Sequence, residues 1–155
     1  MITWLDFETK SECNLLTAGA YNYAMHPSTD VLCMAYAYDD GEVQLWTPDQ
    51  PFPEIRGQIR AHNAAFERLI FTYIVQMDFP IERYYCTATQ ARANCLPGGL
   101  EDVGRAVGAA MRKDYRGGAL VRACCIPPYN TELLPELFEY CKQDVRTMRA
   151  VSKSL

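Results

Sequence analysis

The stretch that most constrains this chain is its start, Ile2–Glu8, with the sequence Ile-Thr-Trp-Leu-Asp-Phe-Glu. Its apolar and β-branched residues are typical of a short buried strand. Successive side chains of a strand alternate between its two faces, so Asp6 and Glu8 point to one side. Leu5 and Phe7 point to the other. The sequence therefore predicts a core strand that presents two carboxylates on one patch at its end.

Two carboxylates at this spacing repel each other. Each raises the proton affinity of the other unless a positive charge lies between them. A hard divalent cation such as Mg²⁺ or Mn²⁺ is the usual partner of such a pair. The same pair also fits the solvated face of an ordinary strand, so the rest of the chain has to separate the two interpretations.

The length of 155 residues fits one domain with a single core. With 49% hydrophobic and 22% charged residues, the composition excludes a disordered tail and a membrane protein. No apolar run approaches the roughly 20 residues of a spanning helix, and no signal-peptide pattern opens the chain. We therefore expect an intracellular protein. A net charge of −4 leaves no overall basic field, so a nucleic-acid partner needs local Lys or Arg side chains or bound metal ions.

The cysteines form an odd set without a CxxC pair, and only two histidines accompany them. This pattern suggests neither a zinc ribbon nor a disulfide framework. We expect reduced, mostly buried small residues at all seven positions: Cys13, Cys33, Cys86, Cys95, Cys124, Cys125 and Cys141.

Beyond the first strand, the chain shows a hairpin pattern. Residues 31–38 and 42–46 are rich in β-branched and aromatic side chains, and Asp39-Asp40-Gly41 between them is a strong hairpin signal. With the first strand they predict a three-stranded antiparallel meander. We expect residues 9–25 to be polar and turn-like, and residues 53–57 to form a short helix.

The second half alternates between strand and helix patterns. Residues 64–76 have apolar side chains at helical spacing, with Asn63 as the expected N-cap. The other expected elements are strands at 58–62 and 83–87, helices at 88–94, 100–109 and 131–152, and an irregular stretch at 111–130. The irregular stretch fits a solvated connection or a ligand-contacting loop in which Lys113 and Arg116 meet phosphate.

Two further acids stand at notable positions. Glu67 lies in the first turn of the helix that follows the strand at 58–62, where the helix dipole favours any acid. Asp144 lies four residues after Tyr140 on the last expected helix, so the two project from one face. Taken singly, each also fits an ordinary surface acid.

The acids occur in three ordered motifs: Leu5-Asp6-Phe7-Glu8-Thr9, His62-Asn63-Ala64-Ala65-Phe66-Glu67 and Tyr140-Cys141-Lys142-Gln143-Asp144. This set resembles the exonuclease motifs of the DEDD superfamily, which is DnaQ-like, in its tyrosine-bearing branch. The closest likeness is to the proofreading 3′-5′ exonuclease domain of phage and prophage family A DNA polymerases. The resemblance covers almost the whole chain, including residues 19–36 and 96–100. One position departs from the pattern, because Glu67 stands where the superfamily ordinarily has Asp.

The resemblance implies an α/β fold of the ribonuclease H-like type, a mixed five-stranded sheet flanked by helices with the acids at one edge. It implies hydrolysis of phosphodiester bonds at the 3′ ends of single-stranded DNA, releasing nucleoside monophosphates. The implied cofactors are two divalent ions, Mg²⁺ or Mn²⁺, about 4 Å apart. Four carboxylates would supply the hard oxygen ligands that such ions require.

The resemblance also implies a role for each motif residue. Asp6 would bridge both ions, and Glu8 and Asp144 would bind the ion that holds the nucleophilic water. Glu67 would support the second ion. Tyr140 would orient the water, because a phenol with an ordinary pKa near 10 is a poor base at neutral pH.

The resemblance further implies that backbone and side chains around Phe7, Thr9 and Asn63 hold the terminal nucleotide, although Phe7 fits a core position equally well. His62 fits a hydrogen-bonded residue at a strand end better than it fits a ligand. Aromatic side chains can stack on unpaired bases without reading sequence. The candidates for this are Tyr21, Tyr23 and Tyr115.

These expectations describe one exonuclease domain over residues 1–155, either free-standing or split, or the N-terminal part of a longer polymerase. Its partners would be DNA and a polymerase domain or subunit, in the cytoplasm of a bacterium or a phage-infected host, without a membrane. Two alternatives stay open. One is a catalytically weak or inactive module that binds nucleic acid or docks a polymerase, and the other is a nuclease of the same fold that acts on RNA. A purely structural protein has no need for this ordered set of acids.

Overall fold

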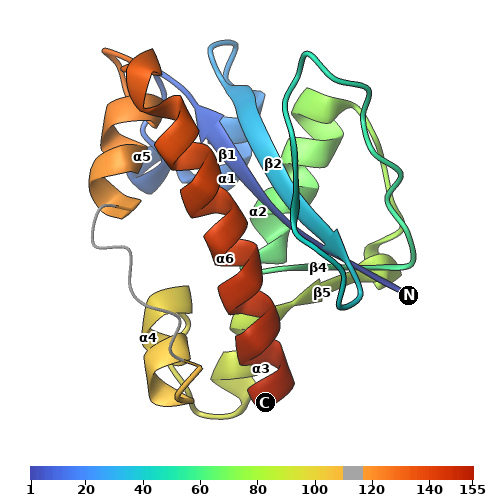
Figure 1. Cartoon of the computed structure of the whole chain (residues 1–155). Coiled ribbons are helices and arrows are strands. Elements are labelled where there is room, and N and C mark those ends of the chain that lie inside the picture. Colours follow the sequence, from blue (N-terminus) through green and yellow to red (C-terminus); the bar gives the residue numbers. More distant parts are fainter. Residues whose placement is uncertain (110–116) are drawn as a thin grey trace.

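A five-stranded mixed sheet with helices on both faces makes up residues 1–109 and 117–155, the part of the chain that this computed structural model describes (Figure 1). The strands are β1 (Ile2–Lys10), β2 (Asp30–Tyr38), β3 (Gln44–Trp46), β4 (Gln58–Ala61) and β5 (Tyr84–Cys86). The α-helices are α1 (Leu15–Met25), α2 (Ala64–Ile70), α3 (Thr87–Ala93), α4 (Leu100–Ala106), α5 (Gly117–Cys125) and α6 (Leu134–Ser154). Single helical turns cover η1 (Phe71–Val75), η2 (Ile81–Arg83) and η3 (Thr131–Leu133). The predicted fold class is confirmed.

β1 occupies the middle of the sheet, whose strand order is β3-β2-β1-β4-β5. It pairs antiparallel with β2 and parallel with β4, and β4 pairs parallel with β5. The predicted meander of three antiparallel strands is confirmed, with β2 and β3 joined across residues 39–43. The first strand therefore has neighbours on both sides, and Thr3, Trp4 and Leu5 in its first half are all buried.

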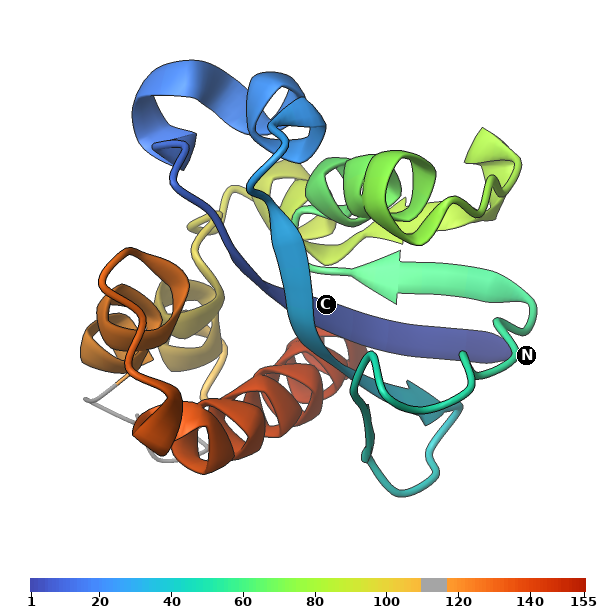
Figure 2. The ribbon, with the colours of Figure 1, turned by 90° about the horizontal axis from the view of Figure 1, so that it is seen from above.

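The two faces of β1 pack against different helices, and Figure 2 shows α6 on one side of the sheet and α2 on the other. On the α2 face, Leu5 and Phe7 belong to a core that includes Phe71 and Ile70. On the α6 face, Trp4 packs in a cluster with apolar residues of α6, among them Cys141, Val145 and Met148. Asp6 and Glu8 follow Trp4 on this second face, so the alternation predicted for Ile2–Glu8 sets the acids against α6.

The prediction of a polar, turn-like stretch at 9–25 was wrong. Leu15–Met25 form α1, whose N-cap Asn14 accepts hydrogen bonds from the backbone N–H groups of Leu16 and Thr17. Gly19 interrupts this helix with a left-handed φ of 80°. Leu16 is 95% exposed, so the first half of α1 has no apolar stripe from which a helix could be recognised.

The expected helix at 53–57 is absent from these residues, which the structure describes in full as irregular backbone. Thr3 explains the extended path. Its hydroxyl accepts a hydrogen bond from the Arg56 N–H at 2.8 Å and lies 2.7 Å from the Arg56 carbonyl oxygen, to which it donates. This contact between segments distant in sequence overrides the local helix signal.

The irregular stretch expected at 111–130 is corrected in part, because Gly117–Cys125 form α5. Residues 110–116, with Lys113, Tyr115 and Arg116, lie outside the described residues. The last helix also begins later than expected. A 3₁₀ turn comes first, capped by the Asn130 side chain, which accepts from the Glu132 N–H, and α6 starts at Leu134.

Candidate active site

β1 brings the first two acids of the site together. The ligand atoms of Asp6, Glu8 and Cys141 all lie within 4.8 Å of one another. In the β1–β2 ladder, Glu8 pairs with Cys33, and the register shifts immediately after Glu8. Such an irregularity changes the direction of a strand locally. The acids are thus held on a rigid central strand at the point where regular pairing breaks.

The turn from β4 into α2 brings Glu67 to the same place. β4 runs parallel to β1 and ends at Ala61, and Asn63 reverses the chain with left-handed backbone angles (φ 79°, ψ 49°). Glu67 then falls in the first turn of α2, only 2% exposed. Its Oε2 has no hydrogen-bond partner among the described residues. A buried carboxylate oxygen without a partner is costly, and this structure keeps one next to Asp6.

The pKa values report how closely the acids gather. Burial raises the pKa of Asp6 to about 7. The pKa of Glu8 rises well above its usual range, first through burial and then through the negative charges of Asp6, Cys33, Asp144 and Glu67. Burial and the charge of Asp6 raise the pKa of Glu67 in the same way. The other three predicted acids therefore all lie within electrostatic range of Glu8.

These carboxylates fit a cation site. Within residues 1–109 and 117–155, no ion pair involves Asp6, Glu8 or Glu67. Oxygen donors in this number and proximity suit a hard divalent ion, and the unpartnered Oε2 of Glu67 gives that ion a further contact. Asp6, Glu8, Glu67 and Asp144 are the residues that could hold it.

α6 supplies the third motif. Tyr140 and Asp144 lie one turn apart on this helix, and their side chains are hydrogen-bonded. Burial, then the charges of Asp144, Glu8 and Asp6, raise the pKa of the Tyr140 phenol. The phenol therefore keeps its proton at neutral pH and can donate a hydrogen bond but cannot act as a base.

Two neighbours of this site were not identified from the sequence. Gly117 begins α5 directly against Tyr140: a Cβ atom added there would lie 2.3 Å from Tyr140 Cε2 and 3.0 Å from its hydroxyl oxygen. Cys141 was expected only as a reduced, buried small residue. Its position next to Tyr140 in the third motif was the available signal, whereas nothing local to Gly117 indicates its contact.

The predicted substrate residues differ in their surroundings. The Phe7 side chain packs against Phe71 in the core, with ring centroids 5.1 Å apart, which leaves its backbone as the group near the site. The Thr9 hydroxyl is hydrogen-bonded to the Tyr23 hydroxyl at 2.7 Å, and both side chains are buried, so the Tyr23 ring has no exposed face for a base. Asn63 is exposed at the turn into α2.

The other aromatic and histidine predictions can be compared with the structure as well. Tyr21 is 55% exposed and meets Tyr73 edge to face, so it keeps a free surface. His62 is hydrogen-bonded through its ring nitrogens to the Thr87 hydroxyl and to the Gly98 carbonyl oxygen. The interpretation of His62 as a satisfied residue at a strand end is confirmed. The seven cysteines are all free thiols, and four of them are buried.

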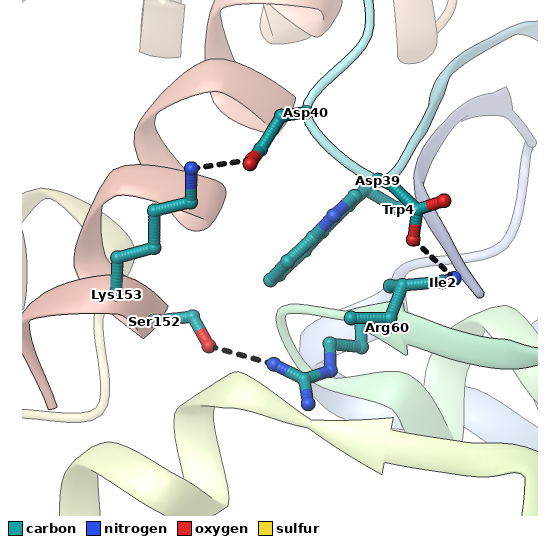
Figure 3. A pocket seen from close by; sticks show the side chains of 7 residues that line it. All are labelled: Ile2, Trp4, Asp39, Asp40, Arg60, Ser152 and Lys153. Atoms are coloured by element: carbon teal, nitrogen blue, oxygen red, sulfur yellow. Dashed lines mark hydrogen bonds and ion pairs between the residues drawn. The ribbon is translucent and has the colours of Figure 1, made fainter.

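A cavity of about 310 Å³ lies near the other end of β1, between the start of β1 and the end of α6 (Figure 3). Its charged groups are paired: Lys153 binds Asp40, Asp39 accepts from the Ile2 N–H, and Arg60 donates to the Ser152 hydroxyl. The Arg60 guanidinium also lies 5.1 Å from the ring centroid of Trp4 and 4.5 Å from that of Tyr85. This cavity has no cluster of unpaired acids.

Comparisons with known proteins show what the sequence and the fold of this chain are similar to. The sequence matches no family profile. It is 31% identical to a DNA polymerase of Bacillus phage SP02, in an alignment that covers 97% of this chain and 27% of the polymerase. The fold resembles a solved structure described as the apo form of a nuclease, with a TM-score of 0.60, 15% identity and coverage of 99% of this chain and 70% of that one. None of the helices in the described ranges has the length and apolarity needed to cross a membrane. The chain is therefore similar over nearly its full length to a quarter of a phage DNA polymerase, and it has a nuclease-like α/β fold.

Proposed function

We propose that this chain is a metal-dependent 3′-5′ exonuclease that hydrolyses the terminal phosphodiester bond of single-stranded DNA. The observation that carries the proposal is the buried Glu67, whose Oε2 has no partner in the described residues and lies beside Asp6. A fold does not keep three mutually repelling carboxylates without a neighbouring cationic side chain for stability, because each of them opposes folding at neutral pH. Cation binding accounts for all three.

In this proposal, Asp6 would be a ligand shared by the two cations. Glu8 and Asp144 would hold one of them, and Glu67 would support the other. Bound there, divalent cations would stabilise the negative charge that develops on the attacking and leaving oxygens. The buried setting strengthens this effect, since charges interact more strongly away from water.

Tyr140 has the role of positioning the attacking water. Its raised pKa keeps the phenol protonated, and its hydrogen bond with Asp144 fixes the hydroxyl close to the carboxylates. The Tyr140 ring packs directly against Gly117, which leaves no room for a Cβ atom, and this contact supports the orientation of the ring. The backbone near Phe7 and the exposed Asn63 would contact the terminal nucleotide.

The substrate and the direction of attack rest on the motif resemblance and on the polymerase relative. The relative is a DNA polymerase, so a proofreading role next to a polymerase domain or subunit is the function that fits this chain best. Proofreading requires removal of a 3′-terminal nucleotide from an unpaired end. Exposed aromatic side chains such as Tyr21 would then stack on unpaired bases.

The test uses single-stranded DNA oligonucleotides labelled at the 3′ or the 5′ end, with Mg²⁺, with Mn²⁺ and with a chelator. We expect metal-dependent, stepwise loss from the 3′ end by the native chain and none by Asp6→Asn. Asp40→Asn is the matched control, because Asp40 is an exposed acid at the far end of the same face, paired with Lys153. An RNA oligonucleotide of the same sequence tests the substrate class. DNA binding without cleavage in either metal would instead indicate an inactive binding module.

A further inference from the structure

A buried thiol lies inside the carboxylate cluster. Cys141 is fully buried, and its Sγ donates to the Asp6 side chain, with Sγ 3.5 Å from Oδ2. The same sulfur lies 3.4 Å from the Asp6 carbonyl oxygen. Glu8 contributes a carboxylate oxygen within 4.8 Å of both groups. The cluster therefore combines hard oxygen donors with one soft sulfur donor, a combination that a site used only by Mg²⁺ does not need.

We propose that Cys141, together with Asp6 and Glu8, forms a binding site for a thiophilic divalent cation such as Zn²⁺ or Cd²⁺, and that this cation displaces the ions used in hydrolysis. The binding itself is independent of the enzymatic activity. Only the displacement of catalytic ions rests on the proposed function.

The spacing of the donor atoms suits such an ion. Zinc binds cysteine sulfur at about 2.3 Å and carboxylate oxygen at about 2.0–2.2 Å in tetrahedral geometry. A tetrahedron with those bond lengths has a sulfur-to-oxygen edge of roughly 3.5 Å. The distance from Cys141 Sγ to Asp6 Oδ2 is 3.5 Å, so these two donors already have the required separation.

Charge and burial favour the same ion. Glu67 adds a buried carboxylate with an unpartnered Oε2 next to Asp6, which is an independent sign that this cluster is built for a cation. When the ion binds, the S–H proton passes to the buffer and the sulfur-to-metal bond replaces the hydrogen bond to Asp6. The thiolate then gives the soft ion an advantage that Mg²⁺, which prefers oxygen ligands, does not share.

Cys33 is the other thiol close enough to the cluster to bind a soft ion in place of Cys141. It is buried opposite Glu8 on β2, and the Cys141 side chain is hydrogen-bonded to it. It does not belong to the group of ligand atoms that lie within 4.8 Å of one another. Cys33→Ala therefore serves as the near control, and Cys95→Ser, at an exposed position after α3, as the distant one.

The experiment is a titration of the metal-free protein with Co²⁺ or Cd²⁺, followed by the ultraviolet charge-transfer absorption of a sulfur-to-metal bond. We expect a saturable band in the native chain, in Cys33→Ala and in Cys95→Ser, and its loss in Cys141→Ser. Asp6→Asn keeps the thiol but should lower the affinity for the ion at least about 10–100-fold. Circular dichroism of each variant establishes that it is folded.

The outcomes separate this proposal from the proposed function. A band that persists in Cys141→Ser, or no band in the native chain, would overturn the thiol site whatever the activity. If the chain cleaves DNA, traces of Zn²⁺ or Cd²⁺ should inhibit cleavage by the native protein, and Cys141→Ser should resist them by about tenfold in concentration. If the native chain shows the band but does not cleave DNA, the thiol metal site is supported and the nuclease function is contradicted.

Discussion

The two ends of β1 present charges to the same face of the sheet in opposite ways. At the start of the strand, Arg60 stacks on Trp4 and binds Ser152, and Lys153 pairs with Asp40. Two strand positions beyond Trp4, Asp6 begins a cluster of acids in which Asp6, Glu8 and Glu67 form no ion pair within residues 1–109 and 117–155. α6 spans both regions, with Cys141 near one end and Ser152 near the other.

This difference separates groups that stabilise the fold from groups kept for chemistry. At the paired end, each charge has a partner and contributes modestly to folding. At the acidic end, burial and mutual repulsion disfavour the ionised carboxylates, so the metal-free fold is less stable at neutral pH than it would be without them. Such a cluster is typical of a binding site, where residues that bind a ligand lower the stability of the ligand-free fold.

The largest expected effect comes from Asp6→Asn. The substitution removes the central acid of the cluster, and we expect DNA cleavage to fall by about 10³-fold or more, since a metal site supplies several kcal/mol of charge stabilisation. The same variant should melt at a higher temperature than the native chain in chelator, because it removes a buried repelling charge. Cleavage rates and thermal melts of the same preparations measure both changes. Equal cleavage by the variant and the native chain would contradict the assignment.

Asp40→Asn sharpens this contrast. It removes an acid of the same face at the paired end, where Lys153 is the partner. We expect cleavage within about twofold of the native rate and only a small change in stability, because exposed ion pairs contribute little to folding. Any large loss of activity in this control would mean that the two ends are functionally linked.

The next effect concerns the support of Tyr140. In Gly117→Ala, the new Cβ would lie 2.3 Å from Tyr140 Cε2, so the ring has to move away from the carboxylates. We expect cleavage to fall about 10–100-fold, the loss that misplacement of a positioning group produces. Gly118→Ala is the matched control in the same helix, because its Cβ would lie 3.5 Å from the nearest atom, Arg122 Nη1. Steady-state rates with saturating DNA compare the two, and equal rates would show that Tyr140 tolerates displacement.

Much of this site could be predicted from the sequence because its chemistry lies in short local motifs. The strand period alone aligned Asp6 with Glu8, and the strand-to-helix turn alone placed Glu67 at the end of β4. The contacts of Gly117 and Cys141 depend instead on how α5 and α6 pack, which no local pattern encodes. Their roles became visible only from distances between residues far apart in the chain.

Two errors in the predicted secondary structure have a similar cause. α1 was not predicted because Gly19 breaks it and its first half is exposed, so the apolar period of a helix is missing. The expected helix at 53–57 was replaced by extended backbone hydrogen-bonded to Thr3, a residue some fifty positions away. In both cases tertiary contacts or exposure decided the outcome against the local signal.

The pH dependence of stability should differ in sign between the two ends. In the unfolded chain, Asp and Glu ionise near pH 4, whereas burial raises the pKa of Asp6 to about 7 in the fold. Between those values the metal-free fold binds more protons than the unfolded chain, so this contribution falls as the pH rises. The hydrogen bond and charge of Lys153 lower the pKa of Asp40, and that contribution is instead lost as the pH falls.

Melting temperatures in chelator from pH 5 to pH 8 measure this dependence. Relative to Asp6→Asn, the native chain should lose several degrees over the range, because the variant has no carboxyl to ionise at that position. Saturating Mn²⁺ should restore the native melting temperature at pH 8 by binding only the folded state. A native curve parallel to that of Asp6→Asn would show that the buried acid does not titrate in this range.

The last comparison tests the paired end by itself, where the expected change is in stability and not in cleavage. Arg60 lies between the Trp4 and Tyr85 rings, so Arg60→Ala removes two cation–π contacts and the hydrogen bonds to Gln58 and Ser152. We expect a loss of about 1–2 kcal/mol in the free energy of unfolding and a cleavage rate within about twofold of native, because no catalytic group touches Arg60. Arg105→Ala, at an exposed ion pair on α4, should change stability by less than about 0.5 kcal/mol. Urea unfolding and cleavage assays of the two variants measure the pair. A tenfold loss of cleavage in Arg60→Ala, with stability unchanged, would make the cavity beside Trp4 part of the substrate path and would end the division of β1 into a stabilising and a chemical end.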